Sequence, residues 1–303
     1  CELGPRPIDL HLSALRQMGA VITEEGDTLR CAAPGGLHGA AVQLPYPSVG
    51  ATENLLIAAA GTPAETKITG AAAEPEISDL LAYLRGCGAR IESQPDGAIL
   101  VQGREALTGC CCHAILPDRI EAATYLAAAA ITGGEITVYA SPEHLAAPLA
   151  ALRRMGCRIT TGEQSITLTA PEHLQGAGSI VTLPYPGFPT DLQAIFMALA
   201  AAAEGYTAFT ETVFPRRWAH VEELRRLGAD ITVVGSHAVI RGAPLIGSAL
   251  TCTDLRAGAA VVLAALAAKG ESSVTAISHI ERGYADFVPT LRHLGADICL
   301  TEV

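Results

Sequence analysis

The feature that most constrains the fold of this chain is a sequence pattern that occurs five times. In each copy a Leu-rich helical run ends in Gly and is followed by an apolar residue. The five copies close at Gly19, Gly88, Gly156, Gly228 and Gly295. Successive closing glycines lie 69, 68, 72 and 67 residues apart. A steady period of this size indicates one supersecondary unit that repeats along the chain and buries its apolar face against its neighbours.

A second pattern alternates with the first. Four Ala-rich runs each begin at Ser or Asp, at residues 48–60, 118–131, 191–203 and 254–268. Ser and Asp are preferred at helix starts because their side chains accept orphan backbone N–H groups. A β-rich segment such as 135–138 follows each Ala-rich run, and a hairpin pattern such as 159–168 follows the Leu-rich copies. Each unit of about 70 residues therefore reads strand–helix–strand–helix–strand–strand.

The two kinds of helix differ in the surface they can bury. The Ala-rich runs have little polar surface and are expected to be buried on all sides, whereas the Leu-rich runs carry one apolar stripe opposite Arg and Glu. Buried helices surrounded by sheets satisfy both patterns, which predicts an α/β fold. If the units group in threes, residues 116–303 form a second domain of three repeat units, and residues 1–115 form part of a first domain.

Composition excludes several classes of function. A net charge of −11 argues against a nucleic-acid partner, which needs a basic surface. No apolar stretch reaches the roughly 18 residues that span a bilayer, so no membrane association is expected. Nine cysteines, an odd number without a disulfide-framework spacing, favour a reducing cytoplasm. Residues 110–113 read Cys-Cys-Cys-His, but contiguous strand residues point to opposite faces. Cysteines in or beside a strand are therefore a better interpretation than a metal site.

Several longer motifs are superimposed on the repeat. They lie at residues 1–11, 47–54, 74–76, 116–121, 188–191, 211–214, 217, 253–256 and 279–284. Together with the repeat they resemble the enolpyruvyl transferase family, and within it the members that act on UDP-N-acetylglucosamine. The resemblance covers the whole chain. It implies two domains of three units each, an inside-out α/β barrel fold, with an active site in the cleft between the domains and no metal or organic cofactor.

The resemblance also implies a reaction. The family members in question transfer the enolpyruvyl group of phosphoenolpyruvate to the 3′-hydroxyl of UDP-N-acetylglucosamine and release phosphate. This is the first committed step of peptidoglycan synthesis, a cytoplasmic step of cell-wall formation that supports cell shape and cell division. The reaction is an addition followed by an elimination. It needs an acid for the methylene carbon of phosphoenolpyruvate and a base for the sugar hydroxyl.

Three residues carry the catalytic roles by resemblance. Cys1 matches the family cysteine that protonates phosphoenolpyruvate, can form an adduct with it, and is alkylated by the antibiotic fosfomycin. A thiol suits these roles because nearby cations can lower its pKa towards neutrality. Asp191 matches the carboxylate that contacts the 3′-hydroxyl and is the leading base candidate. Its position in the sequence by itself favours a helix N-cap. Asp191 can serve both as the N-cap and as the base. Arg282 is the third residue to which the resemblance gives a catalytic role.

The substrates call for anion-binding groups. Phosphoenolpyruvate carries a phosphate and a carboxylate, which guanidinium groups bind with two parallel hydrogen bonds. By resemblance, Arg217 and Arg282 contact this substrate, and Val213 contacts the sugar. Arg256 also lies in a matched motif and is a further substrate-binding candidate. The nucleotide is expected to contact two segments. The first holds the uridine, and the second, which lies at a helix start, holds the diphosphate. The residues are Arg6, Pro7, Ile8, Asp9 and Leu10 in the first, and Tyr46, Pro47, Ser48 and Val49 in the second.

The chain also departs from the family pattern. Tyr46 stands where many relatives carry Lys at the nucleotide site, and Ala73 stands where relatives often carry Arg. The family has about 114 residues before the matching cysteine, close to what six repeats of about 70 residues require. The first domain is therefore expected to be incomplete in these 303 residues. The missing segment is a candidate partner as a separate chain, and an inactive fragment remains one interpretation.

Two alternative functions stay open at this point. One is the shikimate-pathway relative, 5-enolpyruvylshikimate-3-phosphate synthase, against which the Cys1 motif and the segment from Arg6 to Leu10 argue. The other is a catalytically silent paralogue that binds a UDP-sugar. Tyr46 and Ala73 leave this second interpretation open.

Overall fold

The structure is a computed structural model, and it describes residues 8–110 and 112–301. Its internal contacts divide the chain into two compact units that meet between Leu116 and Pro117. We call them the smaller unit, which ends at Leu116, and the larger unit, which begins at Pro117. Each is described by itself.

The smaller unit contains three helices and six strands in its described part. In chain order they are α1 (Asp9–Gln17), β1 (Val21–Glu25), β2 (Thr28–Ala32), β3 (Ala41–Gln43), α2 (Val49–Ala60), β4 (Glu65–Thr69), α3 (Pro75–Gly86), β5 (Arg90–Ser93) and β6 (Ile99–Gln102).

The larger unit continues the same alternation of helices and strands. Its first part comprises α4 (Arg119–Thr132), β7 (Glu135–Val138), the 3₁₀-helix η1 (Pro142–Leu145), α5 (Ala146–Arg154), β8 (Arg158–Thr161), β9 (Ile166–Thr169), β10 (Gly178–Val181), the 3₁₀-helix η2 (Thr190–Leu192) and α6 (Gln193–Ala202). Its second part comprises β11 (Tyr206–Thr210), α7 (His220–Arg226), β12 (Asp230–Val234), β13 (His237–Arg241), β14 (Ala249–Thr251), α8 (Leu255–Ala267), β15 (Ser273–Thr275), α9 (Ser278–Glu281) and α10 (Phe287–His293).

The five closing glycines confirm the predicted repeat. All five have φ between +95° and +101°, a left-handed conformation that glycine adopts without the steric cost that a Cβ brings. In each copy the glycine N–H donates to the carbonyl oxygen of an Arg three residues earlier, at 2.9–3.0 Å. For example, Gly228 donates to Arg225, and Gly295 donates to Arg292. These turns end α1, α3, α5, α7 and α10 in the same way.

The sheets show how complete each repeat is. The orders β3-β4-β6-β5 and β10-β11-β13-β12 are equivalent: the first pair is parallel and the other two pairs are antiparallel. Both repeats thus confirm the order strand–helix–strand–helix–strand–strand. The sheets β7-β9-β8 and β14-β15 contain only parts of this pattern.

Two expectations about strands are wrong. Residues 103–110 and 112–118 form neither helix nor strand, so Cys110 and Cys112 do not lie in a strand. The hairpin expected after the last closing glycine does not form either, because residues 296–301 have no strand conformation. A strand needs a hydrogen-bonded partner. In the described part of the last repeat, β14 and β15 pair only with each other.

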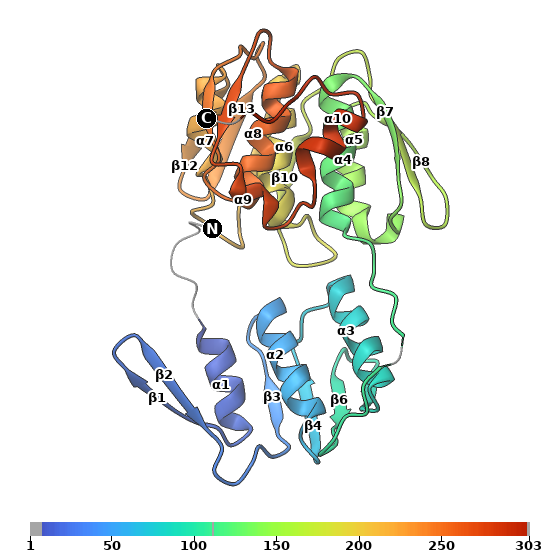
Figure 1. Cartoon of the computed structure of the whole chain (residues 1–303), viewed down its shortest axis with the longest axis vertical. Coiled ribbons are helices and arrows are strands. Elements are labelled where there is room, and N and C mark those ends of the chain that lie inside the picture. Colours follow the sequence, from blue (N-terminus) through green and yellow to red (C-terminus); the bar gives the residue numbers. More distant parts are fainter. Residues whose placement is uncertain (1–7, 111, 302–303) are drawn as a thin grey trace. The chain divides into compact units, whose positions relative to one another are not determined.

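The Ala-rich helices form the core of the larger unit. In Figure 1, α4, α6 and α8 lie together, with β12 and β13 on one side and β7 and β8 on the other. Every residue from Gln193 to Ala201 and from Ala257 to Ala264 is buried. This arrangement confirms the prediction of buried helices surrounded by sheets. Small side chains let the three helix backbones approach closely, which favours their Ala-rich composition.

The smaller unit follows the same plan with fewer repeats. Helices α1, α2 and α3 lie side by side over the sheet β3-β4-β6-β5, and the hairpin of β1 and β2 extends beside α1 (Figure 1). Leu55, Leu56 and Ala59 of α2 are fully buried between these elements. In the described part of the chain, no helix combines the length and the apolar character that crossing a membrane requires.

Candidate active site

The starts of the Ala-rich helices in the larger unit carry three aspartates with different roles. Asp118 and Asp254 are N-caps: one carboxylate oxygen of each accepts two backbone N–H groups of its own helix, at 2.7–3.0 Å. Asp191 was expected to be a cap as well, and this is wrong. It lies within η2, and the caps of η2 and α6 are Pro189 and Leu192, neither of which makes a side-chain capping bond.

Asp191 instead pairs with two arginines, Arg217 from the same repeat and Arg256 from the next one. Nη2 of Arg217 donates to Oδ1 of Asp191 at 2.9 Å, and Nε of Arg256 lies 3.6 Å from the same oxygen. The Arg217 side chain is 6% exposed, whereas the Asp191 side chain is 45% exposed. A buried cation therefore lies beneath a carboxylate that remains accessible to a substrate.

The charges around Asp191 control its protonation. Burial by itself raises the pKa of the Asp191 carboxyl, but Arg217, Arg256 and Arg119 outweigh this effect and hold the pKa below its ordinary value. Asp191 is therefore an ionised acceptor at neutral pH. A carboxylate in this state can accept a proton or a hydrogen bond from a hydroxyl group.

Arg256 is oriented by an aromatic ring. Its guanidinium carbon lies 5.1 Å from the ring centroid of Tyr284, and the Tyr284 hydroxyl is hydrogen-bonded to Thr124 at 2.8 Å. The Nη1 atom of Arg256 is buried and has no hydrogen-bond acceptor among the described residues, whereas Nε is ion-paired with Asp191. Buried guanidinium donors normally have acceptors, so Nη1 is suited to an anionic ligand.

Several residues of this cluster were not singled out from the sequence. Arg119 is 8% exposed, and its guanidinium lies over the Tyr185 ring at 5.7 Å. Arg119, Tyr284, Thr190 and Glu211 all lie inside the motifs quoted above, beside residues that were named. The motifs were a usable signal, but sequence alone does not show which neighbour of a matched residue faces the site.

The other predicted residues of the larger unit occupy different positions. The Val213 backbone N–H donates to Glu211 Oε1 at 2.9 Å, which holds the loop before Arg217. Arg282 is the C-cap of α9 and is exposed, and the described contacts do not bring it to Asp191. Its role in the reaction stays a prediction.

In the smaller unit, two predicted segments meet at helix starts. Asp9 and Leu10 open α1 after its N-cap Ile8, and Val49 opens α2 after Ser48, whose hydroxyl accepts from Ala51 N at 3.4 Å. The amide of Asn54 in α2 donates to Nδ1 of His11 in α1 at 2.6 Å. This bond joins the first turn of α1 to the second turn of α2, so the two segments lie close together.

The surroundings of these helix starts are polar. Tyr46 is 42% exposed, and the backbone N–H of Ser48 donates to its carbonyl oxygen at 2.8 Å. Pro47 lies between them. Burial first and the charge of Glu76 second raise the pKa of the Glu53 carboxyl, while His11 opposes them. Helix N-termini attract anions because their N–H groups and dipoles point outward.

Some predicted residues lie outside the described part of the chain, namely Cys1, Arg6 and Pro7.

The cysteine-rich segment at residues 110–113 shows no metal site. Among the described residues of the chain, no group of three or more His, Cys, Asp or Glu side chains is able to hold a metal ion. His113 instead pairs with Asp79 at 3.0 Å and packs edge-on against Tyr83.

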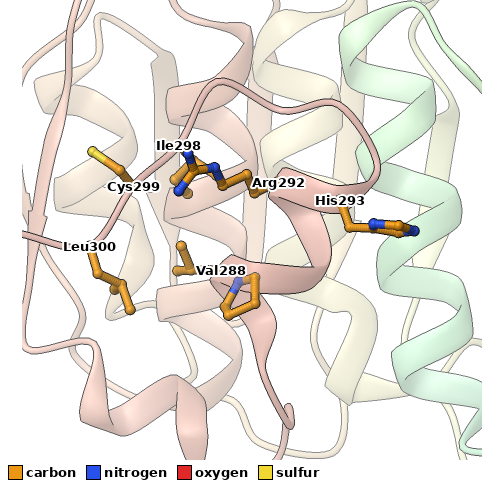
Figure 2. A pocket seen from close by; sticks show the side chains of 7 residues that line it. Val288, Arg292, His293, Ile298, Cys299 and Leu300 are labelled. Atoms are coloured by element: carbon orange, nitrogen blue, oxygen red, sulfur yellow. The ribbon is translucent and has the colours of Figure 1, made fainter.

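A pocket lies beside the last helix of the larger unit. Its lining side chains come from α10 and from residues 298–300 (Figure 2). They are mainly apolar, with Arg292 and His293 as the basic members. None of the predicted site residues lines it, so we do not place the reaction there.

The chain was compared with families and with known proteins. Residues 1–291 match the model of the family EPSP synthase (3-phosphoshikimate 1-carboxyvinyltransferase). Among curated proteins, the chain is 47% identical over 300 residues to UDP-N-acetylglucosamine 1-carboxyvinyltransferase 1 of Symbiobacterium thermophilum, covering 98% of this chain and 68% of that protein. It is 44% identical over 307 residues to the UDP-N-acetylglucosamine 1-carboxyvinyltransferase of Finegoldia magna, covering 100% of this chain and 72% of that protein.

Solved structures show the same fold. The enolpyruvyl transferase NikO from Streptomyces tendae superposes with a TM-score of 0.88 at 27% identity, over 96% of this chain and 72% of that one. EPSP synthase from Acinetobacter baumannii superposes with a TM-score of 0.74 at 21% identity, over 100% of this chain and 74% of that one. The second likeness shows the fold alone. The predicted enolpyruvyl transferase fold is thus confirmed, and the chain belongs to the EPSP synthase (3-phosphoshikimate 1-carboxyvinyltransferase) family of enzymes.

Proposed function

We propose that this chain acts as a UDP-N-acetylglucosamine 1-carboxyvinyltransferase, which transfers the enolpyruvyl group of phosphoenolpyruvate to the 3′-hydroxyl of UDP-N-acetylglucosamine with release of phosphate. The observation that carries this proposal is the identity of 44–47% to proteins of that name over at least 98% of this chain. The alternative acceptor, a shikimate phosphate, has support only from the family description and from structures at 20–21% identity.

Asp191 of the larger unit and Cys1 are the groups proposed for the first half of the reaction. Asp191, ionised and accessible, accepts the proton of the 3′-hydroxyl as its oxygen attacks C2 of phosphoenolpyruvate. Cys1 delivers a proton to C3, so the double bond becomes a single bond and a tetrahedral intermediate forms. In the elimination a proton leaves C3, phosphate leaves C2, and the double bond forms again.

Cations in the same unit suit the anionic reactant. Arg217, Arg256 and Arg282 are assigned to phosphoenolpyruvate, and Arg119 joins them by its place beside Asp191. The Nη1 donor of Arg256, which has no acceptor among the described residues, supports its assignment. Fixed donors of this kind stabilise charge that develops as the phosphate departs.

The helix starts of the smaller unit are assigned to the nucleotide. We place the uridine at the segment of Arg6, Pro7, Ile8, Asp9 and Leu10 and the diphosphate at Tyr46, Pro47, Ser48 and Val49. The bond between His11 and Asn54 supports the two segments acting together. With this activity the protein would serve peptidoglycan synthesis in the cytoplasm, and fosfomycin would alkylate Cys1.

A coupled assay tests the proposal. Phosphate release is measured with phosphoenolpyruvate and UDP-N-acetylglucosamine, and again with shikimate 3-phosphate as the acceptor. We expect release with the UDP-sugar only. Release with shikimate 3-phosphate alone would overturn the proposal.

Two binding measurements distinguish the silent paralogue. Calorimetry with UDP-N-acetylglucosamine reports nucleotide binding, and mass spectrometry after fosfomycin treatment reports alkylation of Cys1. Nucleotide binding without alkylation and without phosphate release would identify a UDP-sugar binder without catalysis.

A further inference from the structure

Glu211 is a fully buried carboxylate for which the proposed reaction has no direct use. It follows β11 and has no exposed surface. Its Oε1 accepts from the backbone N–H groups of Val213 and Phe214, at 2.9 Å each, and from the Thr182 hydroxyl at 2.8 Å. Its Oε2 accepts from the Thr190 hydroxyl at 2.9 Å. The protein thus holds a charged group rigidly in its interior, where charges are costly unless they are paired.

Thr190 connects this carboxylate to the reacting centre. Its only hydroxyl proton is donated to Glu211, so its oxygen lone pair is available to Nη1 of Arg217, which donates to it at 3.2 Å. The other terminal nitrogen of Arg217, Nη2, donates to Asp191. A carboxylate cannot donate a hydrogen bond, so the Thr190 hydroxyl must donate to Glu211, and Arg217 must donate to the Thr190 oxygen.

The two anions near Arg217 differ in rigidity. Asp191 is nearly half exposed and is the proposed base, so its charge changes during the reaction. Glu211 is held by two backbone N–H groups and two hydroxyls and has no exposed surface. A fixed acceptor at one end of the guanidinium determines where the other end points.

We propose that Glu211 is a positioning residue, which acts through Thr190 to hold Arg217 in the orientation that pairs with Asp191. The consequence for catalysis rests on the proposed function, whereas the consequence for Asp191 does not. A purely structural role is the competing explanation: Glu211 would then only close the loop of residues 211–214.

Thr190→Val is the discriminating variant. It removes the hydroxyl that connects Glu211 to Arg217, changes no charge, and leaves the bonds from Val213 and Phe214 to Glu211 in place. Thr190→Ser keeps the hydroxyl and serves as the rescue. Glu223→Gln is the matched control for Glu211→Gln: Glu223 is also buried, and it accepts from Thr251 N at 2.9 Å and pairs with Arg226.

The first readout needs no substrate. The pKa of Asp191 is measured by carbon-13 NMR of labelled aspartate carboxyls, with Asp191→Asn used to assign the signal. Because Arg217 lowers this pKa, its loss of orientation in Thr190→Val should raise the pKa, while Thr190→Ser and Glu223→Gln should leave it unchanged. Glu211→Gln also removes a negative charge, so it is judged by activity and not by this pKa.

The second readout is the kinetics of phosphate release. We expect Thr190→Val and Glu211→Gln to lower kcat/KM for phosphoenolpyruvate about tenfold, and Thr190→Ser and Glu223→Gln to stay near the parent value. Thermal unfolding checks that each variant is folded. An unchanged Asp191 pKa in folded Thr190→Val would overturn the proposal. Absence of turnover in the parent chain would contradict the proposed function only, since the NMR measurement on Thr190→Val still tests whether Thr190 connects Glu211 to Arg217.

Discussion

Arg217 and Asp191 form an ion pair at 2.9 Å in which the cation is buried and the anion is nearly half exposed. They lie 26 residues apart in the chain, Asp191 at the start of an Ala-rich helix and Arg217 in the loop before α7. Burial raises the pKa of Asp191, but the charges of Arg217, Arg256 and Arg119 outweigh burial and lower it, while the Asp191 carboxylate stays open to a ligand.

Asp191→Asn should lower the rate of phosphate release by at least about 100-fold, because an amide cannot accept the hydroxyl proton and general-base contributions are of this size. The matched control is Asp230→Asn, an exposed aspartate at the start of β12 in the same unit. Initial rates at saturating substrate test the prediction. A rate within threefold of the control would exclude Asp191 as the base.

Tyr46→Lys should strengthen binding of UDP-N-acetylglucosamine several-fold. The new ammonium group would lie beside Ser48 at the start of α2, where we place the diphosphate, and exposed pairs of this kind contribute about 0.2–1 kcal/mol. The gain should shrink as salt is added. Calorimetry checks both effects. Tyr139→Lys, at a residue that is 79% exposed in the other unit, adds the same charge elsewhere, and an equal gain there would contradict the assignment.

His220→Gln should flatten the pH dependence of stability in mild acid. Burial, assisted by Arg217 and opposed by Asp254, lowers the pKa of His220 to about 4. Between pH 6.5 and about 4 the unfolded state therefore binds a proton that the folded state does not, so stability falls as the pH falls through this range, by up to about 3 kcal/mol.

Glutamine removes this titration. Urea unfolding at several pH values measures the effect. If the parent chain and His220→Gln lost the same stability between pH 6.5 and 4, the proton linkage would lie elsewhere.

Gly228→Ala should lower the free energy of unfolding by about 1–2 kcal/mol. The Cβ has room, since its nearest neighbour is the Pro244 carbonyl oxygen at 3.8 Å, so the cost comes from φ of +96°. Gly134→Ala is the control, because its Cβ also meets only ordinary contacts, the closest at 3.6 Å, without a left-handed φ. Chemical denaturation of both variants tests the difference, and equal stability losses would contradict it.

Much of the local structure could be predicted from the sequence because it depends on residues a few positions apart. The closing glycines end the Leu-rich helices as the repeat indicated, and Asp118, Asp254 and Ser48 cap the Ala-rich helices next to them. A left-handed turn and a capping bond need only the glycine, or the Ser or Asp, and its own helix. The absence of strands at 112–118 and 296–301 could not be predicted in this way, because pairing depends on a distant partner.

The sequence by itself determined the repeat, the buried and surface helices, and the residue types suited to binding anions. Only the tertiary structure decided which of the three similar aspartates at helix starts is not a cap. Asp191 pairs with Arg217 because the chain folds back within one repeat, and with Arg256 because the starts of the packed helices α6 and α8 lie together. The contacts of Thr190 and Glu211 were decided in the same way, since the position of a buried charge depends on acceptors and donors brought together by packing and not by sequence distance.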